Sequence, residues 1–514
     1  MTKSIAVIGA GHNGLIAATL LAQQGFKVAV YEASASIGGG AQTHEFAPGF
    51  KTSSIAHLLF HWDSKLESQL ALQQNGLRLS APLPSVALST EGSAIVYDHH
   101  QLLAGDYSEV EAVHYREAML RFNSLAQWLA RENKKIPARL GWDRWRDALP
   151  ALGMMIRMRL LGRDLMRDLL RLGTMAIHDV LNEELTDNRL KGALALDAVL
   201  GSHCGSRSGN SFFSWLHRLS GLSQGGYLQV LGGMGALTGA LISAAQSHGV
   251  SIHTNARVLK INTRGERVSG LTLESGQEIY SDAILSAMSA PHALLNLLGA
   301  HALSVEQSHQ LRHLRQRGNV AKVHIAIKGQ VQFHGVSSAH QSARMLIAPS
   351  SEAVDNAFNP VKYQQCANDL VMELHVPSVL DDTLAPAGHQ VVSAIVPFIP
   401  FDCADPNQLR HEVTEKTLAV IEKYMPQIRG HVVASECLLP IEMESRFNIP
   451  KGHWHHTELA IDQALMLRPI PRLAQYRGPV NGLWLCGASM HPGGGIHGRS
   501  AQLAVDTILQ DLRA

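Results

Sequence analysis

The sequence predicts an α/β fold, and three glycine-rich turns that each open a helix are the observations that predict it. An apolar strand at residues 5–8 runs into a Gly-x-Gly-x-x-Gly turn at residues 9–14 and then into a helix, which is the order of a Rossmann-like unit. A glycine cluster at 232–235 also leads into a helix, and a third turn at 487–498 lies between a short apolar strand and the last helix. Together they predict a Rossmann-like, dinucleotide-binding domain assembled from separated parts of the chain.

Each part of the first turn has a role in binding a dinucleotide. Gly9 permits the tight turn out of the strand, Gly11 lets the backbone approach a pyrophosphate, and Gly14 lets the helix pack closely on the strand. The first N–H groups of the helix and its positive dipole end favour a phosphate. Glu32 closes the second strand, where its carboxylate can accept both hydroxyls of an unphosphorylated ribose. The residues expected to bind here are Gly9, Gly11, His12, Asn13, Gly14, Glu32 and Ala33.

Two further glycine clusters favour FAD over NAD, because the first turn alone is common to both. Gly38, Gly39 and Gly40 follow the second strand and bring backbone to the pyrophosphate from its other side. The C-terminal turn suits a cofactor too long for one loop, and its helix N-terminus can stabilise negative charge on a reduced flavin. In that turn the residues expected to bind are Gly487, Pro492, Gly495 and Ile496.

The motifs GAGHNGL near the start, GGMGALTGAL in the middle and LWLCGASMHPGGGIHG near the end resemble those of the phytoene desaturase-like FAD-dependent oxidoreductases. The resemblance covers nearly the whole chain. It implies FAD as the cofactor, a fold of the glutathione-reductase or amine-oxidase type, and a backbone contact with the adenine at Arg257 and Val258. The chain departs from the family pattern at Ala41, where many relatives carry an arginine, and at Ala488, where many carry an acid. Backbone N–H groups are then expected to anchor the cofactor.

We expect the FAD-binding domain to be discontinuous, with residues 1–85, 225–300 and 476–514 as its three parts. The intervening segments, 86–224 and 301–475, are expected to build an inserted α+β substrate domain. The first of these reads as mostly helical, and the second alternates strands with helices.

Composition disfavours several classes of protein. The net charge is +1 and only 17% of the residues are charged, which is untypical of nucleic-acid binders. The five cysteines are widely spaced and odd in number, so neither a disulfide framework nor a zinc site is expected, and no metal is assigned. The chain enters its first strand within a few residues and holds no apolar run of about 18–20 residues, so we expect a cytoplasmic protein without a membrane span.

The segment 154–172 leaves two interpretations open. Apolar residues fall at helical spacing on one face, and arginines repeat every four residues on another. Such a basic amphipathic helix can lie on an anionic membrane and guide a lipid-like substrate into the protein, which would make the protein membrane-peripheral. The alternative is an ordinary surface helix with a solvated charged face, since Asp164 and Asp168 offset part of the charge.

The sequence has one nucleotide-binding turn and no second turn of that kind for NAD(P)H. This indicates that the organic substrate itself reduces the flavin. The expected reaction transfers a hydride from a C–H bond of a hydrophobic substrate, such as a polyene or a lipid, to the flavin, with loss of a proton. His491 and His497 lie in the turn expected near the flavin and are the candidate catalytic residues. His57 and His61 are further candidates, although 28 histidines make any one position weak evidence.

Three alternatives stay open. A flavin amine oxidase uses the same fold and hydride transfer, although an aromatic content of 5% disfavours an aromatic cage around an amine. A non-catalytic FAD-binding scaffold protein is compatible with the missing arginine and the lack of an obvious base. An NAD(P)-only dehydrogenase would be colourless when purified. The residues indicate neither an electron acceptor, with oxygen and a quinone as the candidates, nor an oligomeric state.

Overall fold

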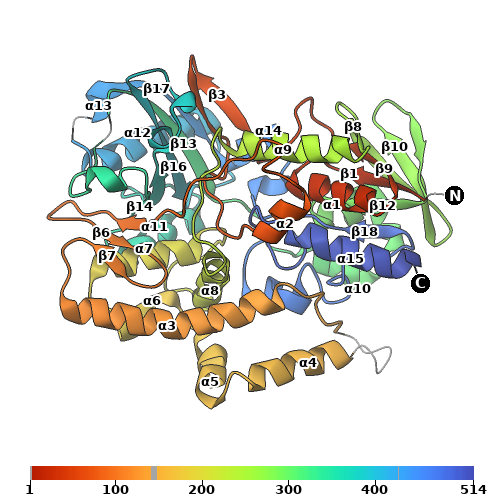
Figure 1. Ribbon diagram of the computed structural model, residues 1–514, viewed down its shortest axis with the longest axis horizontal. Coiled ribbons are helices and arrows are strands. Elements are labelled where there is room, and N and C mark those ends of the chain that lie inside the picture. The colour runs from red at the N-terminus through yellow and green to blue at the C-terminus, as the bar shows by residue number, and fades with distance from the viewer. Residues whose placement is uncertain (1–2, 141–147, 331, 427, 514) are drawn as a thin grey trace.

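The computed structural model describes residues 3–140, 148–330, 332–426 and 428–513. Figure 1 shows two halves, one around a parallel sheet near both chain termini and one around a larger mixed sheet. Within the described residues the strands form sheets of five, eight, three and two strands.

Three separated parts of the chain form the parallel sheet. Its strands and the helices packed beside it are β1 (Ser4–Ile8), β2 (Lys27–Tyr31), β8 (Ser251–His253), β12 (Ala283–Ser286), β18 (Leu483–Leu485), α1 (His12–Gln23), α9 (Met234–Ser247) and α15 (Arg499–Arg513). The strand order is β18-β12-β1-β2-β8, and every pair is parallel. Ile5 of β1 lies between Val28 of β2 and Ala283 of β12. Helix α1 packs on β1 and β2 and also contacts α9 and α15, so the predicted Rossmann-like architecture is confirmed.

The larger sheet is mostly antiparallel. Its strands are β5 (Ser85–Ala87), β6 (Ile95–Tyr97), β7 (Leu102–Ala104), β13 (Val320–Lys328), β14 (Arg344–Ile347), β15 (Met372–His375), β16 (His389–Pro397) and β17 (Val432–Leu438). Their order is β17-β13-β16-β15-β14-β5-β6-β7, and β14 pairs with β5 in parallel. The segment 86–224, expected to be mostly helical, therefore begins with strands. Its short apolar runs pair as a meander at the sheet edge rather than coil into helices.

Two smaller sheets lie beside the parallel sheet and the larger sheet. They consist of β3 (Thr43–Ala47) with β4 (Phe50–Ser53), and of β9 (Val258–Arg264), β10 (Arg267–Leu273) and β11 (Glu278–Tyr280). The β3–β4 hairpin follows the glycine cluster at 38–40 and reaches the larger sheet, where β3 contacts β17. The hairpin thus connects the two halves.

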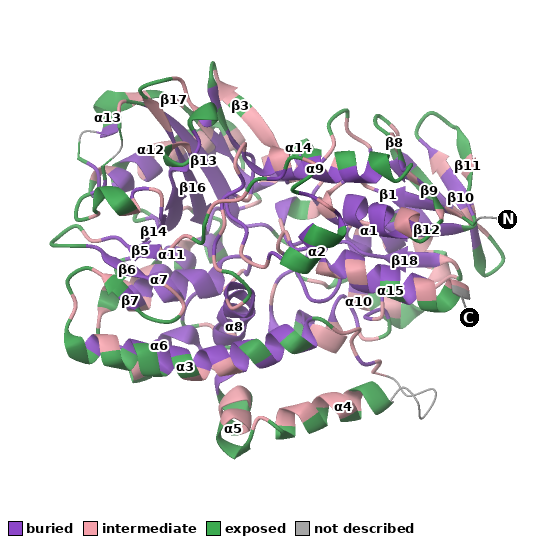
Figure 2. Cartoon of the chain, viewed as in Figure 1, coloured by how far each residue is buried: buried purple, intermediate pink, exposed green. Residues whose placement is uncertain are grey.

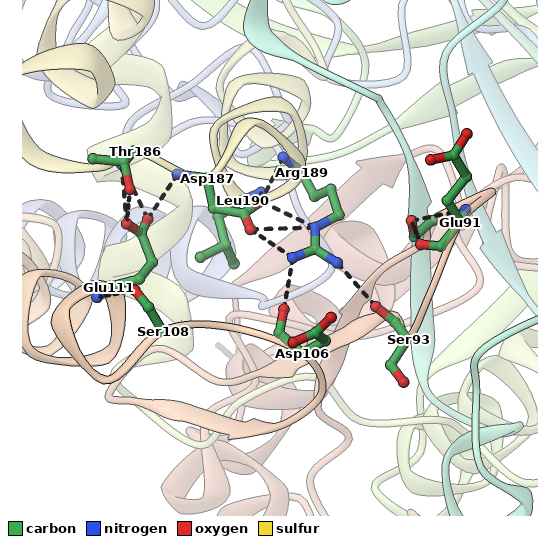
Figure 3. Close-up of polar contacts among 10 residues, drawn as sticks. Glu91, Ser93, Asp106, Ser108, Glu111, Thr186, Asp187, Arg189 and Leu190 are labelled. Carbon is green, nitrogen blue, oxygen red and sulfur yellow. Dashed lines mark hydrogen bonds and ion pairs between the residues drawn. The ribbon is translucent and has the colours of Figure 1, made fainter.

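Most of the remaining helices cover the larger sheet and complete its core, whereas α2 (Ser64–Gln69) and α10 (Val305–Arg312) pack with the parallel-sheet half. The others are α3 (Glu109–Glu132), α6 (Ile177–Glu184), α7 (Asn188–Val199), α8 (Ser211–Leu222), α11 (Ser351–Phe358), α12 (Pro406–Glu422), α13 (Ile428–His431) and α14 (Pro440–Phe447). Figure 3 shows polar contacts around α3 and α7: Glu111 of α3 accepts hydrogen bonds from the Thr186 N–H at 3.1 Å just before α7, and Arg189 of α7 donates to the carbonyls of Ser93, before β6, and Asp106, after β7.

The segment 154–172 forms parts of two helices rather than one. Helix α4 (Ala148–Arg159) ends before Gly162, whose φ of +89° breaks the helical path, and α5 (Arg163–Leu172) follows. Figures 1 and 2 show both helices along one edge of the molecule, with much of their surface exposed. In the described part of the chain, we find no helix with the length and apolar character needed to cross a bilayer.

A buried ion cluster joins the larger sheet to α7. Arg344 of β14 is fully buried, and its guanidinium pairs with Asp197 of α7 and with Glu373 of β15. The guanidinium carbon also lies 4.4 Å from the centroid of the Tyr227 ring. Since a buried charge is tolerated only when it is paired, Arg344 depends on both carboxylates and they depend on it.

We predict that Arg344→Met lowers the free energy of unfolding by about 3–5 kcal/mol, because it leaves two buried carboxylates without their main partner. The matched control is Arg429→Met, because the Arg429 side chain is 41% exposed and pairs with Glu415 and Glu422 at the surface. The free energy of unfolding of this control should fall by only about 0–1 kcal/mol. Denaturant unfolding followed by circular dichroism measures both, and equal losses would contradict the assigned role of Arg344.

Candidate active site

A large cavity is lined by residues from both halves of the molecule. Its empty volume, open mouth included, is about 1650 Å³. The parallel-sheet half contributes the turn after β1 and the residues that follow β2, and the other half contributes residues near β15 and β16.

One end of the cavity is formed by the turn between β1 and α1. Gly11 is the N-cap of α1, and no side chain caps the helix, so its first N–H groups are open to an anion that the helix dipole also favours. A Cβ on Gly11 would meet no described atom within 4 Å, whereas a Cβ on Gly14 would lie 2.0 Å from the Gly9 carbonyl oxygen. Gly11 leaves room beside the backbone, and Gly14 permits the helix to pack against the turn.

Glu32 follows β2 directly and faces the same turn. One carboxylate oxygen accepts a hydrogen bond from the Ala10 N–H at 2.8 Å, and the other accepts one from the Ser34 N–H at 2.9 Å. Two backbone donors therefore fix the carboxylate in the cavity wall. Each oxygen keeps a lone pair for a further donor, which suits the two hydroxyls of a ribose.

Three buried polar atoms of the lining have no protein partner among the described residues. They are His12 Nε2, Asn13 Oδ1 and His456 Nδ1. Buried polar groups are nearly always hydrogen-bonded, so these atoms indicate a polar ligand in the cavity. Burial lowers the pKa of His12 to about 4, which keeps its imidazole neutral. The uncapped helix, the fixed carboxylate and these unpaired atoms fit the phosphate and sugar groups of a dinucleotide.

All but two of the residues predicted to bind the cofactor line this cavity. Those that line it are Gly9, Gly11, His12, Asn13, Gly14, Glu32, Ala33, Gly38, Gly39, Gly40, Val258, Gly495 and Ile496, and the neighbouring Arg257 does so as well. The two outside the lining are Gly487 and Pro492. A Cβ on Gly487 would lie 2.1 Å from the Met288 carbonyl oxygen, so this glycine permits close approach of the segments after β12 and β18. Pro492 lines a separate small cavity beside His497.

His491 and His497, the two histidines predicted to be catalytic, also lie outside the lining. His497 uses both ring nitrogens within its own loop, since Nε2 donates to the Gly493 carbonyl at 3.1 Å and Nδ1 accepts from the Arg499 N–H at 3.0 Å. His491 lines another small cavity together with Glu132. Burial lowers the pKa of both imidazoles, to about 3 for His491.

The other end of the cavity is largely apolar. Its apolar lining residues are Leu58, Phe60, Ile395 and Trp454, and its polar ones include His57, Arg218, Tyr227 and Glu373, whereas Ile55 and Ile449 of the same lining lie beside Gly40. The Arg218 guanidinium lies 4.7 Å from the centroid of the Phe60 ring and donates to the Tyr227 hydroxyl at 3.3 Å. An apolar wall with a few convergent polar groups is typical of a site for an organic substrate.

The strand register brings a lysine and a carboxylate to one face of the larger sheet. Ile395 of β16 pairs with Lys322 of β13 on one side and with Glu373 of β15 on the other. His57, from the segment after β4, bridges the two charged groups. Lys322 Nζ donates to His57 Nδ1 at 2.8 Å, because an ammonium has no acceptor, and His57 Nε2–H then donates to Glu373 at 2.8 Å.

The surroundings of Lys322, His57 and Glu373 set the charge that each of these side chains carries. Burial and the positive charge of Lys322 together lower the pKa of His57 to about 4, so the imidazole is neutral. Burial also lowers the pKa of Lys322 to about 7. Burial alone would raise the pKa of Glu373, but the charge of Arg344 and the hydrogen bond from His57 outweigh it and hold that pKa well below its usual range. The cavity wall therefore presents an ionised carboxylate held by fixed donors.

Sequence reasoning named His57 but missed Lys322, Arg344 and Glu373. The available signal was a charged residue inside an otherwise apolar strand, as in VAKVHIAIK, RMLI and MELH. Residues in the middle of such strands are expected to be apolar, so an embedded charge indicates an ion cluster or a functional site. The partners come from strands far apart in the sequence, and the sequence alone does not pair them.

The two glycines of the first turn provide a matched pair of variants. Gly14→Ala should lower the melting temperature with or without the dinucleotide, because its Cβ collides with the Gly9 backbone. Gly11→Ala has room in the ligand-free protein, so it should keep its melting temperature and lose most of the bound dinucleotide. Thermal denaturation and the absorbance of bound cofactor measure the two effects. Full cofactor retention in Gly11→Ala would contradict the placement of the phosphates.

Comparisons with known proteins agree with this geometry. The chain matches the family described as flavin containing amine oxidoreductase over residues 14–509. Pyridine nucleotide-disulfide oxidoreductase domain-containing protein 2 of Rattus norvegicus is 31% identical and covers 99% of this chain and 93% of its own length. The phytoene desaturase (lycopene-forming) of Pantoea ananas is 26% identical over 99% of this chain and 100% of its own. In its fold, a solved variant of putrescine oxidase is similar with a TM-score of 0.63 at 17% identity, covering 100% of both chains.

The family match spans both halves of the molecule and both ends of the cavity. It confirms FAD, predicted from the glycine clusters, as the cofactor. The expected resemblance to the phytoene desaturase-like oxidoreductases is confirmed as well. The chain therefore belongs to the flavin-containing amine oxidoreductase family and is an FAD-dependent oxidoreductase.

Proposed function

We propose that the protein is a dehydrogenase or desaturase that takes a hydride from a C–H bond of a hydrophobic substrate, with a polyene or lipid as the favoured class. The observation that carries the proposal is the apolar end of the cavity, in which the Glu373 carboxylate and His57 are the polar groups connected to a buried lysine. Similarity to a phytoene desaturase supports the same substrate class.

FAD, when bound, supplies the acceptor for the hydride. The chain's own residues then have to bind the substrate, exclude water and receive the proton that the substrate loses. Leu58, Phe60 and Trp454 give an apolar surface on which a hydrocarbon can be oriented. Their packing also keeps water from the reacting carbon.

Glu373 is the proposed acceptor of the proton. Its carboxylate is ionised and lines the cavity, with Arg344 and His57 as its fixed donors. A weak base is sufficient, because a substrate that has lost a hydride is strongly acidic. Lys322 holds the His57 tautomer that donates to Glu373, so Lys322 and His57 are positioning residues for the carboxylate.

We predict that Glu373→Gln and His57→Gln retain FAD and reduce it more slowly with substrate, by about 10²–10⁴-fold for Glu373→Gln. Anaerobic stopped-flow bleaching of the flavin with polyenes, fatty acyl compounds and amines measures the rate. His57→Gln keeps the ion pair between Arg344 and Glu373. It therefore tests the role of this network even if Glu373→Gln fails to fold.

The matched control is Glu111→Gln, which changes a buried carboxylate outside the cavity lining that bonds to Thr186 (Figure 3). It should reduce FAD at the wild-type rate. Bleaching by amines alone would favour the amine oxidase alternative. If no compound of any class bleached the flavin, the protein would have to be regarded as a non-catalytic FAD-binding scaffold.

We also propose that α4 and α5 bind an anionic membrane, from which the substrate enters. Leu149, Leu152, Ile156 and Leu160 fall at helical spacing on or just after α4, and each is more than half exposed. Arg159 and Arg163 are exposed beside this stripe. An exposed apolar stripe flanked by arginines suits the interface of a bilayer with negative headgroups.

The double variant Leu152→Glu/Ile156→Glu should abolish flotation of the FAD-loaded protein with phosphatidylglycerol vesicles, since it places charge in the apolar stripe. The control Val305→Glu changes a residue of α10 that is 89% exposed and should float like the wild type. Binding should weaken as salt is raised. Equal flotation of both variants would contradict a role for α4.

A further inference from the structure

A second polar row lies on the larger sheet, two residues along β13 from Lys322. His324 pairs with Glu436 of β17 on one side and with Ser393 of β16 on the other. The β3–β4 hairpin packs over this row, and its His44 Nε2 lies in hydrogen-bond contact with the Glu436 carboxylate. None of His44, His324 and Glu436 lines the FAD cavity, and the Ser393 hydroxyl, 3.4 Å from His57 Nδ1, lies between their cluster and the active-site network.

The atoms of this cluster that could coordinate a metal ion point toward one another. One ligating atom from each of His44, His324 and Glu436 lies within 4.8 Å of the other two. The rings of His44 and His324 meet edge to face with centroids 5.6 Å apart. His324 is fully buried, its Nδ1 lies 3.2 Å from the Ser393 hydroxyl, and its Nε2 has no partner in the described part of the chain. A buried ring nitrogen left unpaired beside two other donors indicates a missing ligand.

Each of the three side chains is also held by a contact outside the cluster. His44 Nδ1 lies 2.9 Å from the Ser54 hydroxyl, and the second oxygen of Glu436 accepts from Arg446 at 3.1 Å. The Ser393 contact fixes His324 in the same way. Metal-binding histidines are almost always oriented by a hydrogen bond through the nitrogen that does not coordinate. The cluster therefore has the supporting contacts of a metal site.

We propose that His44, His324 and Glu436 bind a divalent transition-metal cation. Two imidazoles and one carboxylate suit Zn²⁺ and its first-row neighbours, whereas Mg²⁺ and Ca²⁺ prefer oxygen ligands. The side chains of His44 and Glu436 are 14% and 25% exposed, which gives an ion a path from solvent. The wide cysteine spacing predicts no zinc site, and the proposed site departs from that expectation because it uses no cysteine.

A cation here would join the β3–β4 hairpin to the larger sheet. His44 belongs to the hairpin, while His324 and Glu436 belong to two paired strands of the sheet. The hairpin directly follows the glycines that line the FAD cavity. The cation would therefore stabilise the contact between the two halves. Its loss should lower the stability of the folded protein more than it changes the rate of the reaction.

The test uses the FAD-loaded, full-length protein after dialysis against EDTA. Titration with ZnCl₂ in a calorimeter should show one more bound ion per chain in the wild type than in His44→Gln or Glu436→Gln. The melting temperature of the wild type should rise with Zn²⁺, since ligand binding stabilises the folded state, and the two variants should lack this rise. His44 and Glu436 are partly exposed, so both variants are expected to fold.

The matched control is His411→Ala, which removes an exposed histidine of α12 outside the cluster and should bind Zn²⁺ like the wild type. With 28 histidines in the chain, weak surface binding is expected in every variant. Equal Zn²⁺ stoichiometry and equal melting shifts in wild type, His44→Gln and Glu436→Gln would mean adventitious binding only and would overturn the proposal. An equal melting shift with MgCl₂ would overturn the transition-metal assignment.

Discussion

The contact between Gly14 and the Gly9 carbonyl is the constraint on which the cofactor end of the molecule depends. Only a residue without a side chain lets α1 begin against the turn after β1, since a Cβ would lie 2.0 Å from that oxygen. The position of α1 in turn aims its uncapped N–H groups into the cavity, while the pairing of β1 with β2 brings Glu32 within reach of the Ala10 N–H. The steric requirement at Gly14 therefore fixes the phosphate-binding groups, and the strand pairing beside it places the ribose-binding carboxylate.

The register of the larger sheet sets the other end of the cavity. Pairing of β13, β16 and β15 brings Lys322 and Glu373 to one face, and buried charges there are stable only as a connected network. Arg344 and His57 complete that network. The same sheet, two residues further along β13, carries His324. A single strand thus contributes to the substrate end of the FAD site and to the proposed metal site, and Ser393 of β16 lies between them, with its hydroxyl 3.4 Å from His57 Nδ1 and 3.2 Å from His324 Nδ1.

The parts that the sequence predicts well are local in the chain. The Gly-x-Gly-x-x-Gly turn, its helix and Glu32 lie within one short segment, and their spacing specifies the geometry directly. Glu373 and Lys322 come from strands whose partners are set by tertiary pairing, so no spacing rule links them. His491 and His497 show the converse limit. Both lie in a glycine-rich loop with residues that line the cavity, but a position in a loop does not determine where a side chain points, and neither imidazole lines it.

The cavity is inferred to hold FAD with its phosphates at α1 and its ring end toward His57 and Glu373. A crystal structure of the protein grown with FAD would locate each part of the cofactor. We expect the pyrophosphate over the backbone of Gly11, the ribose at Glu32, and the flavin ring in the part of the cavity that Glu373 lines. A flavin ring directed away from the larger sheet, with the Glu373 end filled by other side chains, would rule out this placement.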